Sequence, residues 1–148
     1  MALLELKNLK TFFATKRGTV KAVNGVSYSL DAGKVLGVVG ESGSGKSVSA
    51  MSILRLLDGN GYIDSGEILF NGVDLTKLSI NEMYKIRGNE ISVIFQEPMT
   101  SLNPVFTVSR QISEPLMIHQ GMTKKQAAAK AVELLSDVKI PNPEVVAK

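Results

Sequence analysis

The sequence predicts a mixed α/β fold, in which a small antiparallel β part is attached to a core sheet flanked by helices. Three observations support this prediction. Two strand-like segments with a polar turn between them come first. A short apolar segment then runs directly into a glycine-rich loop and a helical pattern, and a hairpin signal, a second apolar segment and further helical patterns follow. No repeat or linker divides the 148 residues, which suffice for one domain with a core.

The first two strand-like segments predict an antiparallel hairpin. Leu3–Leu9 and Ala22–Leu30 have the composition of strands, and the polar stretch Thr15–Gly18 between them is typical of a turn. A second turn at Asp31–Gly33 leads into Lys34–Val39, which is almost wholly apolar. Such a segment predicts a strand buried on both faces of a core sheet.

A helical pattern follows the glycine-rich loop. It runs from Gly45 to Leu57 without a helix breaker, and Asp58–Gly61 ends it. A hairpin of Glu67–Phe70 and Val73–Leu75 is expected around Asn71-Gly72, followed by a helix from the capping box of Ser79 and Glu82 to about Arg87. A buried strand is expected at Ile91–Phe95 and a helix at Val108–His119. A last helix, Thr123–Val138, would start with a capping box of Thr123 and Gln126, and Pro141–Pro143 would break the regular structure after it.

The composition excludes several classes of protein. Hydrophobic residues make up 44% and charged residues 21%, which is ordinary for a soluble globular chain. The longest apolar runs fall far short of the ~18 residues that span a bilayer, and the start lacks the pattern of a signal peptide. Zero cysteines exclude disulfides and thiolate metal sites. The net charge of +3 comes from scattered Lys and Arg, so no nucleic-acid partner is indicated. We expect a cytoplasmic location.

The glycine-rich loop fits the pattern G-x-x-x-x-G-K-[ST] at every fixed position. Glycines let the backbone point its N–H groups inward at phosphate oxygens, and the following helix adds free donors and the positive end of its dipole. Lys46 would reach the β- and γ-phosphates, and the Ser47 hydroxyl would bind Mg²⁺. The predicted ATP-Mg²⁺ site consists of Gly40, Glu41, Ser42, Gly43, Ser44, Gly45, Lys46 and Ser47.

The alternative to a phosphate site is a flexible Gly/Ser surface turn. A chain of this length matches the pattern by chance about once in a hundred, given average residue frequencies. The apolar segment before the loop and the helical pattern after it favour the functional interpretation. Glu41 occupies a position where the pattern is free, so its charge need not touch phosphate. A P-loop alone leaves kinases, GTPases, helicases and transporter ATPases open.

Three segments discriminate among these classes. Ala22–Leu30, Leu36–Ser47 and Ile94–Pro104 closely resemble the ATP-binding subunits of ABC transporters, especially those of oligopeptide, dipeptide and nickel importers. The resemblance covers nearly the whole chain. It implies a P-loop NTPase core of strand, P-loop and helix, with an N-terminal antiparallel β subdomain and the start of a helical subdomain. The implied parts are 1–32 and about 60–80 for the antiparallel part, 33–58 and 90–96 for the nucleotide-binding core, and 97–148 for the Q-loop and partial helical subdomain.

The resemblance also assigns two residues outside the P-loop. Gln96 matches the family's Q-loop glutamine, whose amide oxygen can bind Mg²⁺ or the attacking water, so Gln96 joins Lys46 as a catalytic residue and Ser47 as a metal ligand. In these ATPases an aromatic residue of the first hairpin stacks on adenine. Counting along the hairpin gives Phe13, while strand alternation sends Phe12 to the other face. A phenylalanine of the core is the alternative for Phe13. His119 does not match the family's switch histidine and is expected to be a solvated helix residue.

Several parts of the family's catalytic apparatus do not occur in this sequence. The Leu-Ser-Gly-Gly-Gln signature, the second Asp-Glu motif and the switch histidine are absent. The chain therefore resembles the first part of such a subunit, cut off inside the helical subdomain. We expect weak binding of Mg-ATP without turnover at a family-like rate, because the missing segments supply the general base and the element that closes the site in the family. The alternative to an energy-coupling ATPase subunit is a truncated, catalytically inactive nucleotide-binding fragment.

The resemblance implies partners as well. A second ATP-binding subunit would complete a homo- or heterodimer, transmembrane permease subunits would bind it at the cytoplasmic face of the membrane, and an extracytoplasmic solute-binding protein would act indirectly. A P-loop kinase or GTPase is a rival class, but the guanine-recognition pattern Asn-Lys-x-Asp is absent. Peptide import is the favoured function.

Overall fold

The computed structural model describes residues 2–96 and 101–148. The chain divides into two compact units, Met1–Met83 and Tyr84–Lys148. No helix among the described residues is long and apolar enough to cross a membrane.

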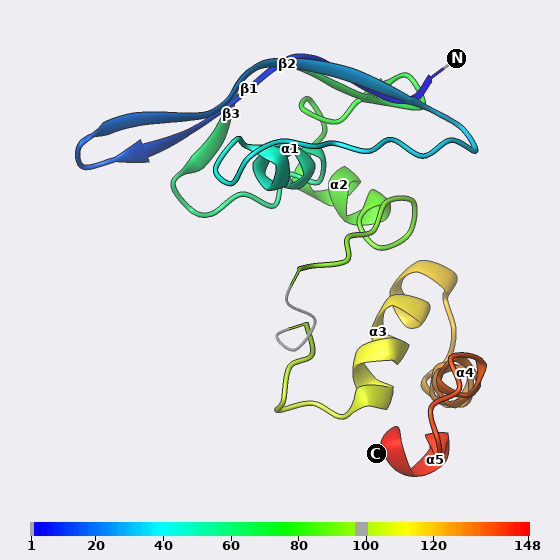
Figure 1. Cartoon of the computed structure of the whole chain (residues 1–148). Coiled ribbons are helices and arrows are strands. Elements are labelled where there is room, and N and C mark those ends of the chain that lie inside the picture. Colours follow the sequence, from blue (N-terminus) through cyan, green and yellow to red (C-terminus); the bar gives the residue numbers. More distant parts are fainter. Residues whose placement is uncertain (1, 97–100) are drawn as a thin grey trace. The chain divides into compact units, whose positions relative to one another are not determined.

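The first unit is built on a four-stranded antiparallel sheet (Figure 1). Its strands are β1 (Ala2–Thr15), β2 (Gly18–Asp31), β3 (Gly61–Phe70) and β4 (Val73–Asp74), in the order β2-β1-β3-β4. Both predicted hairpins are therefore confirmed, and the first is longer than predicted. At the turn of the first hairpin, Thr15 Oγ1 donates to Gly18 O at 2.6 Å. In the second, Asn71 and Gly72 have φ of 49° and 81°, the positive values that a tight two-residue hairpin turn needs.

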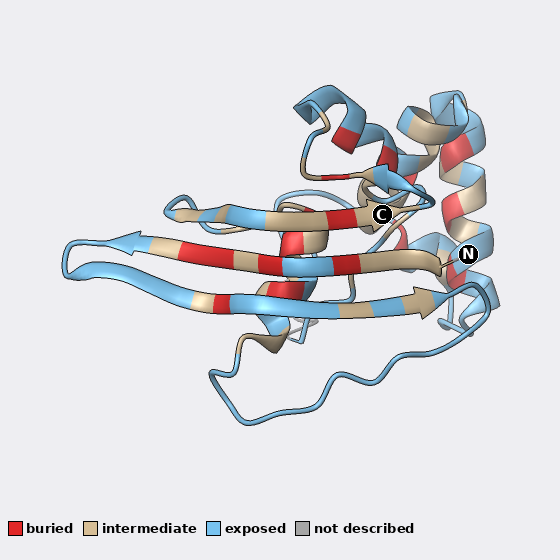
Figure 2. Cartoon of the chain, turned by 90° about the horizontal axis from the view of Figure 1, so that it is seen from above, coloured by how far each residue is buried: buried red, intermediate tan, exposed pale blue. Residues whose placement is uncertain are grey.

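The core of the first unit lies along the central strand β1. Leu6, Leu9 and Thr11 are buried there, whereas β2 at the edge of the sheet is mostly exposed (Figure 2). Leu6 and Leu9 are three positions apart, and both are buried because Asn8 between them has φ of 48° and interrupts the register with both neighbouring strands. Such a bulge reverses the alternation of faces.

Helix α1 (Lys46–Ile53) packs against one face of the sheet (Figure 1). Thr11 Oγ1 and Ser52 Oγ lie 2.8 Å apart and are buried. The Ser52 hydroxyl already donates to Val48 O at 2.7 Å. Since a serine hydroxyl has one proton, Thr11 must be the donor to Ser52. A buried hydrogen bond therefore ties the helix to β1.

Helix α1 ends earlier than the predicted Leu57. Arg55 has φ of 52°, Leu56 N donates to Met51 O at 2.9 Å, and Arg55 N donates to Ser52 O at 3.0 Å. These two bonds form a Schellman motif with arginine in the place that glycine usually takes. The Arg55 guanidinium donates to Leu78 O at 2.5 Å, which fixes this left-handed residue to the loop after β4. The sequence pattern did not indicate this stop, because it depends on a contact 23 residues away.

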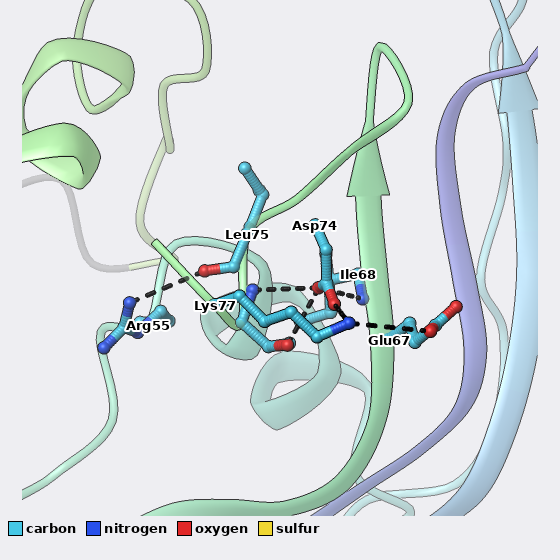
Figure 3. A network of polar contacts seen from close by, with 7 residues as sticks. Arg55, Glu67, Ile68, Asp74, Leu75 and Lys77 are labelled. Carbon is cyan, nitrogen blue, oxygen red and sulfur yellow. Dashed lines mark hydrogen bonds and ion pairs between the residues drawn. The ribbon is translucent and has the colours of Figure 1, made fainter. Parts of the chain in front are cut away.

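A network of polar contacts surrounds Asp74 at the end of β4 (Figure 3). Asp74 Oδ1 accepts hydrogen bonds from Thr76 N at 3.0 Å and Thr76 Oγ1 at 2.8 Å, and from Ile68 N at 3.4 Å. The Lys77 ammonium lies 2.9 Å from Asp74 Oδ2. Burial raises the pKa of the Asp74 carboxyl, but the hydrogen bonds from Lys77, Thr76 and Ile68 outweigh burial and lower the pKa below its ordinary value.

Two predicted core strands do not form. Residues 34–39 and 92–95 have no strand structure, and Ile91 makes a single isolated bridge to Arg87. Val35 and Val39 are 98% and 92% exposed, and Ile94 is 97% exposed. A buried parallel strand needs neighbouring strands on both sides to satisfy its backbone groups. Among the described residues no strand pairs with either segment, so the prediction of buried strands at Lys34–Val39 and Ile91–Phe95 was wrong for this chain.

Helix α2 (Ile80–Ile86) joins the two units. The capping box that opens it is confirmed: Ser79 N and Ser79 Oγ donate to Glu82 Oε2 at 2.7 and 2.6 Å, and Glu82 N donates back to Ser79 Oγ at 3.3 Å. Gly88, with φ of 76°, follows the helix as predicted.

The second unit is helical. It contains α3 (Val108–Gln120), α4 (Lys124–Asp137) and the short α5 (Pro143–Val146), and α3 packs against α4. The predicted capping box of α4 is present, with Gln126 Oε1 accepting from Thr123 N at 3.0 Å. Ala127, Ala131 and Leu135 form its buried stripe. The break at Pro141–Pro143 is confirmed by Asn142, whose φ is 50°, but the pattern did not indicate that α5 begins directly after it.

Candidate functional site

The glycine-rich loop runs from Gly40 into the first turn of α1. Gly43 and Gly45 have φ of 79° and 88°, which L side chains rarely adopt. At Gly45 a Cβ atom would lie 2.3 Å from the carbonyl oxygen of Ala22 in β2. Glycine is therefore required at this position both by the backbone conformation and by the close approach of the sheet.

The N-terminus of α1 is open to a ligand. Gly45 is the N-cap residue and makes no side-chain cap hydrogen bond, and the first turn contains no acidic residue. The first amides of a helix have no partners within the helix, and the dipole makes this end positive. Helix α1 thus presents backbone donors and partial positive charge on the side where the loop lies.

Lys46 lies across the loop. Its ammonium donates to Gly40 O and Glu41 O, both at 2.6 Å, and to Ser44 Oγ at 3.3 Å. The two carbonyls and the hydroxyl hold the cation against the backbone of the loop, where an anion seated on the helix N-terminus would meet it. A Cβ atom on Gly40 would lie 2.8 Å from Ser44 Oγ, so the loop also closes tightly on itself.

These residues fit the phosphate groups of a nucleotide with its metal ion. The cradle combines glycines at positive φ, an uncapped helix end and one lysine, which together are the features that bind phosphate. Ser47 is exposed in the first turn of α1, where its hydroxyl can serve as an oxygen ligand. No cluster of three or more metal-binding side chains exists among the described residues, so a cation here would depend on Ser47 and on ligand oxygens.

The structure places the other loop residues at the surface. Glu41, Ser42 and Gly43 are exposed, which agrees with the free positions of the motif. A pocket of about 250 Å³ adjoins the loop on its β2 side. Its lining residues are Val23, Val26, Tyr28, Val38, Val39, Gly40, Ser44, Gly45, Lys46 and Ser49.

Phe13 lies on β1, two residues beyond Thr11. Alternation puts it on the face that carries the Thr11–Ser52 bond, which is the face of α1. It pairs with Gly61 of β3, and a Cβ atom on Gly61 would lie 2.7 Å from Phe13 Cε1, so glycine leaves room for the ring. Phe12 is buried, and its ring meets Tyr62 edge to face at 6.3 Å. Phe13 is the more exposed of the two residues, and its assignment as the adenine-stacking residue remains a prediction.

Gln96 is in the second unit, whereas the loop is in the first. It is an exposed residue at a bend, directly after the apolar segment that ends at Phe95. Its predicted approach to Ser47 remains a prediction. The following residues 97–100, which belong to the segment behind the family resemblance, lie outside the described residues. His119 lies in the last turn of α3. Its Nε2 atom would be 3.7 Å from a Cβ atom added to Gly88, and both residues belong to the second unit.

Sequence reasoning missed the residues that fix the loop in place. The Ala22–Gly45 approach, the Thr11–Ser52 bond and the Arg55–Leu78 bond each join residues that lie more than twenty positions apart. Hydroxyl residues in a helix give no sign that they are buried. The one available signal was Thr11, a polar residue that directly precedes Phe12 and Phe13 in the strand.

Comparisons with known proteins agree with this geometry. A family model described as ABC transporter matches residues 23–147. The oligopeptide transport ATP-binding protein OppD of Bacillus subtilis (strain 168) is 52% identical over 143 residues, which are 96% of this chain and 40% of OppD. The dipeptide transport ATP-binding protein DppD of Lactococcus lactis subsp. cremoris (strain MG1363) is 50% identical over 96% of this chain and 41% of DppD. The chain thus spans about two fifths of the length of these relatives.

Solved structures share the fold. The dimeric structure of MJ0796, described as a bacterial ABC transporter cassette, matches with a TM-score of 0.74 at 22% identity over 94% of this chain and 58% of that chain. A post-hydrolysis state of MJ0796 bound to ADP and Pi matches with a TM-score of 0.76 at 23% identity, with the same coverage. At this level of identity the likeness concerns the fold alone.

Proposed function

Because the chain belongs to the ABC transporter family, we propose that it is the ATP-binding, energy-coupling part of a transporter subunit that imports peptides. The family resemblance and the fold class expected from the sequence are both confirmed by the family match and by the solved cassettes. The peptide substrate is proposed from the relatives, which are named for oligopeptide and dipeptide transport.

The observation that carries the proposal is the cradle at the start of α1. Gly45 at φ 88° opens an uncapped helix, and Lys46 spans the loop with three hydrogen bonds to it. When ATP binds, the Lys46 ammonium exchanges these acceptors for phosphate oxygens, and the amides of the first turn donate to the same group. The loop therefore orients the phosphates and offsets their charge.

The other site residues complete this assignment. Ser47 and Gln96 would hold Mg²⁺, which supplies charge neutralisation between the β- and γ-phosphates when bound. Phe13 would stack on adenine, a contact worth roughly 1–3 kcal/mol per base in nucleic-acid complexes. Lys46 and Gln96 are the catalytic residues of the proposal, because Lys46 meets the transferred group and Gln96 meets the water.

The intact subunit would hydrolyse ATP to drive transport. It would act with a second ATP-binding subunit and with transmembrane permease subunits at the cytoplasmic face of the membrane, served by a solute-binding protein. The 148 residues contain no second Asp-Glu motif, signature or switch histidine. We therefore expect this chain by itself to bind Mg-ATP and to lack turnover, as a nucleotide-binding fragment would.

A titration of the whole chain with a fluorescent ATP analogue and Mg²⁺ tests the proposal, with phosphate release measured in parallel. Lys46→Ala should weaken binding at least tenfold, since a charge-assisted contact to phosphate contributes about 1.5–3 kcal/mol. Lys34→Ala is the matched control, because Lys34 is an exposed lysine at the start of the unpaired segment 34–39. If both variants bind the analogue equally well, the loop is not part of the nucleotide site. Sustained, Lys46-dependent phosphate release would instead contradict the expected lack of turnover.

A further inference from the structure

A second pocket lies in the helical unit, away from the glycine-rich loop in sequence. It has a volume of about 430 Å³ and is formed by Arg110, Ser113 and Met117 of α3 with Lys124 and Ala128 of α4. This volume is within the range of sites that bind small organic molecules. Met117 and Ala128 form an apolar part of the pocket wall, so the pocket can accept the hydrocarbon part of a ligand next to its polar groups.

Ser113 is a buried polar residue whose hydroxyl lacks a partner. The residue is 4% exposed, and its Oγ atom makes no hydrogen bond to any described residue. A serine within a helix commonly bonds the carbonyl one turn back, and a buried hydroxyl without a partner is unfavourable. Ser113 lines the pocket, and its Oγ atom is itself buried. A rotation about the Cα–Cβ bond would be needed for the hydroxyl to meet a bound molecule. The unpaired hydroxyl thus indicates a ligand that hydrogen-bonds there.

The charges on the pocket wall define the sign of that ligand. Arg110 and Lys124 line the pocket, and no acidic residue is among the lining residues. The Arg110 guanidinium stacks on the Phe106 ring, with Cζ 3.9 Å from the ring centroid. Stacking fixes the plane of the guanidinium and leaves its N–H edge available for a bidentate contact. One of the two cations of the pocket wall is therefore held in place by stacking.

Side chains, rather than the end of α3, must provide the recognition. The amide of Ser109 donates to Ala147 O at 2.9 Å, and the amide of Arg110 donates to Thr107 Oγ1 at 3.3 Å. Both donors are thus already used within the helical unit. The side chains of the pocket wall are left for an anion, among them the cations Arg110 and Lys124 and the hydroxyls of Ser109 and Ser113.

We propose that this pocket binds the phosphate monoester group of a small organic molecule, with Arg110 and Lys124 as its cations and Ser113 as its hydrogen-bond partner. A phosphate monoester carries about 1.5–2 negative charges near neutral pH, which matches two cations, whereas a carboxylate carries one. The organic part lies against Met117 and Ala128. The site is independent of the nucleotide site proposed at Gly40–Ser47.

Residue-resolved NMR of the whole ¹⁵N-labelled chain, titrated with phenyl phosphate, tests this proposal. Saturable shifts are expected at the amides of Arg110, Ser113 and Lys124, and any entry of the probe into the glycine-rich loop would be read separately at Gly45 and Lys46. Lys124→Gln should weaken the helical-unit binding about tenfold, because a charge-assisted contact to phosphate is lost. Lys125→Gln is the matched control, since the exposed Lys125 does not line the pocket.

Two further measurements make the test sharper. Ser113→Ala should weaken phenyl phosphate binding a few-fold while leaving the thermal midpoint unchanged or higher, since the hydroxyl has no partner to lose. Benzoate, with the same ring and one charge, should bind at least tenfold more weakly. The proposal is overturned by a lack of saturable shifts in α3 and α4, by equal binding of benzoate, or by equal losses in the Lys124 and Lys125 variants. A Ser113→Ala variant that binds as tightly as the wild type removes Ser113 from the site.

Discussion

Replacing Gly45 with alanine tests whether the glycine-rich loop is fixed by its contact with the sheet. At φ 88°, an L-residue in this left-handed region costs roughly 1–2 kcal/mol. The added Cβ would also lie 2.3 Å from Ala22 O. Real Cβ atoms essentially never have a contact shorter than 3.0 Å. The obstacle is backbone in a paired strand, so relief requires the loop or β2 to move by about 0.7 Å, and such overpacking costs about 1–3 kcal/mol more.

Gly43→Ala is the matched control. Gly43 has nearly the same φ, 79°, but a Cβ there would meet nothing within 4 Å. Urea unfolding followed by circular dichroism should therefore show a loss of about 1–2 kcal/mol for Gly43→Ala and about 2–5 kcal/mol for Gly45→Ala. The nucleotide titration should show the larger loss of affinity for Gly45→Ala as well. Equal effects of the two variants would refute the role assigned to the Ala22 contact.

Two other predictions concern the polar contacts. Asp74→Asn should lower the free energy of unfolding by about 1–3 kcal/mol at pH 6, because the carboxylate accepts several hydrogen bonds. The lowered pKa of Asp74 means that its stabilisation is present above its ordinary pKa of 3.8 and is lost as the pH falls through the folded-state value. The difference between wild type and Asp74→Asn in urea unfolding should therefore shrink between pH 6 and pH 3, and a constant difference would contradict the assignment. Thr123→Ala should cost about 1 kcal/mol, since it removes the N-cap of α4. Amide hydrogen exchange in α4 should report the loss, and Thr19→Ala, at an exposed position of β2, serves as its control.

Local signals predicted most of the secondary structure. Asn71-Gly72, the two capping boxes and Gly88 are each confirmed, because a turn or cap depends on residues within a few positions of one another. The glycine-rich loop was predictable for the same reason. The positive φ of Gly43 and Gly45 follows the motif, and the contacts of Lys46 lie within six residues.

Features that depend on distant partners were not predictable. Apolar composition at Lys34–Val39 indicates a strand, but it cannot supply the neighbouring strands, and none pairs with this segment among the described residues. The bulge at Asn8 and the helix stop at Arg55 likewise contradict simple alternation and the expected glycine. At Asn8 and Arg55 the backbone conformation is set by a contact across the sheet or with a later loop, which a single pass along the sequence does not contain.

The hydrogen bond between Thr11 and Ser52 fixes a distance inside the first unit, namely that between Phe13 on β1 and Lys46 at the start of α1. Phe13 follows Thr11 by two residues on a strand, and Lys46 precedes Ser52 by six residues on a helix, so both are joined to the same buried pair of hydroxyls by rigid elements. The distance between the proposed base-stacking ring and the glycine-rich loop is therefore determined by strand and helix geometry. A ligand that bridges the two would be selected by how far its ring stands from its phosphates.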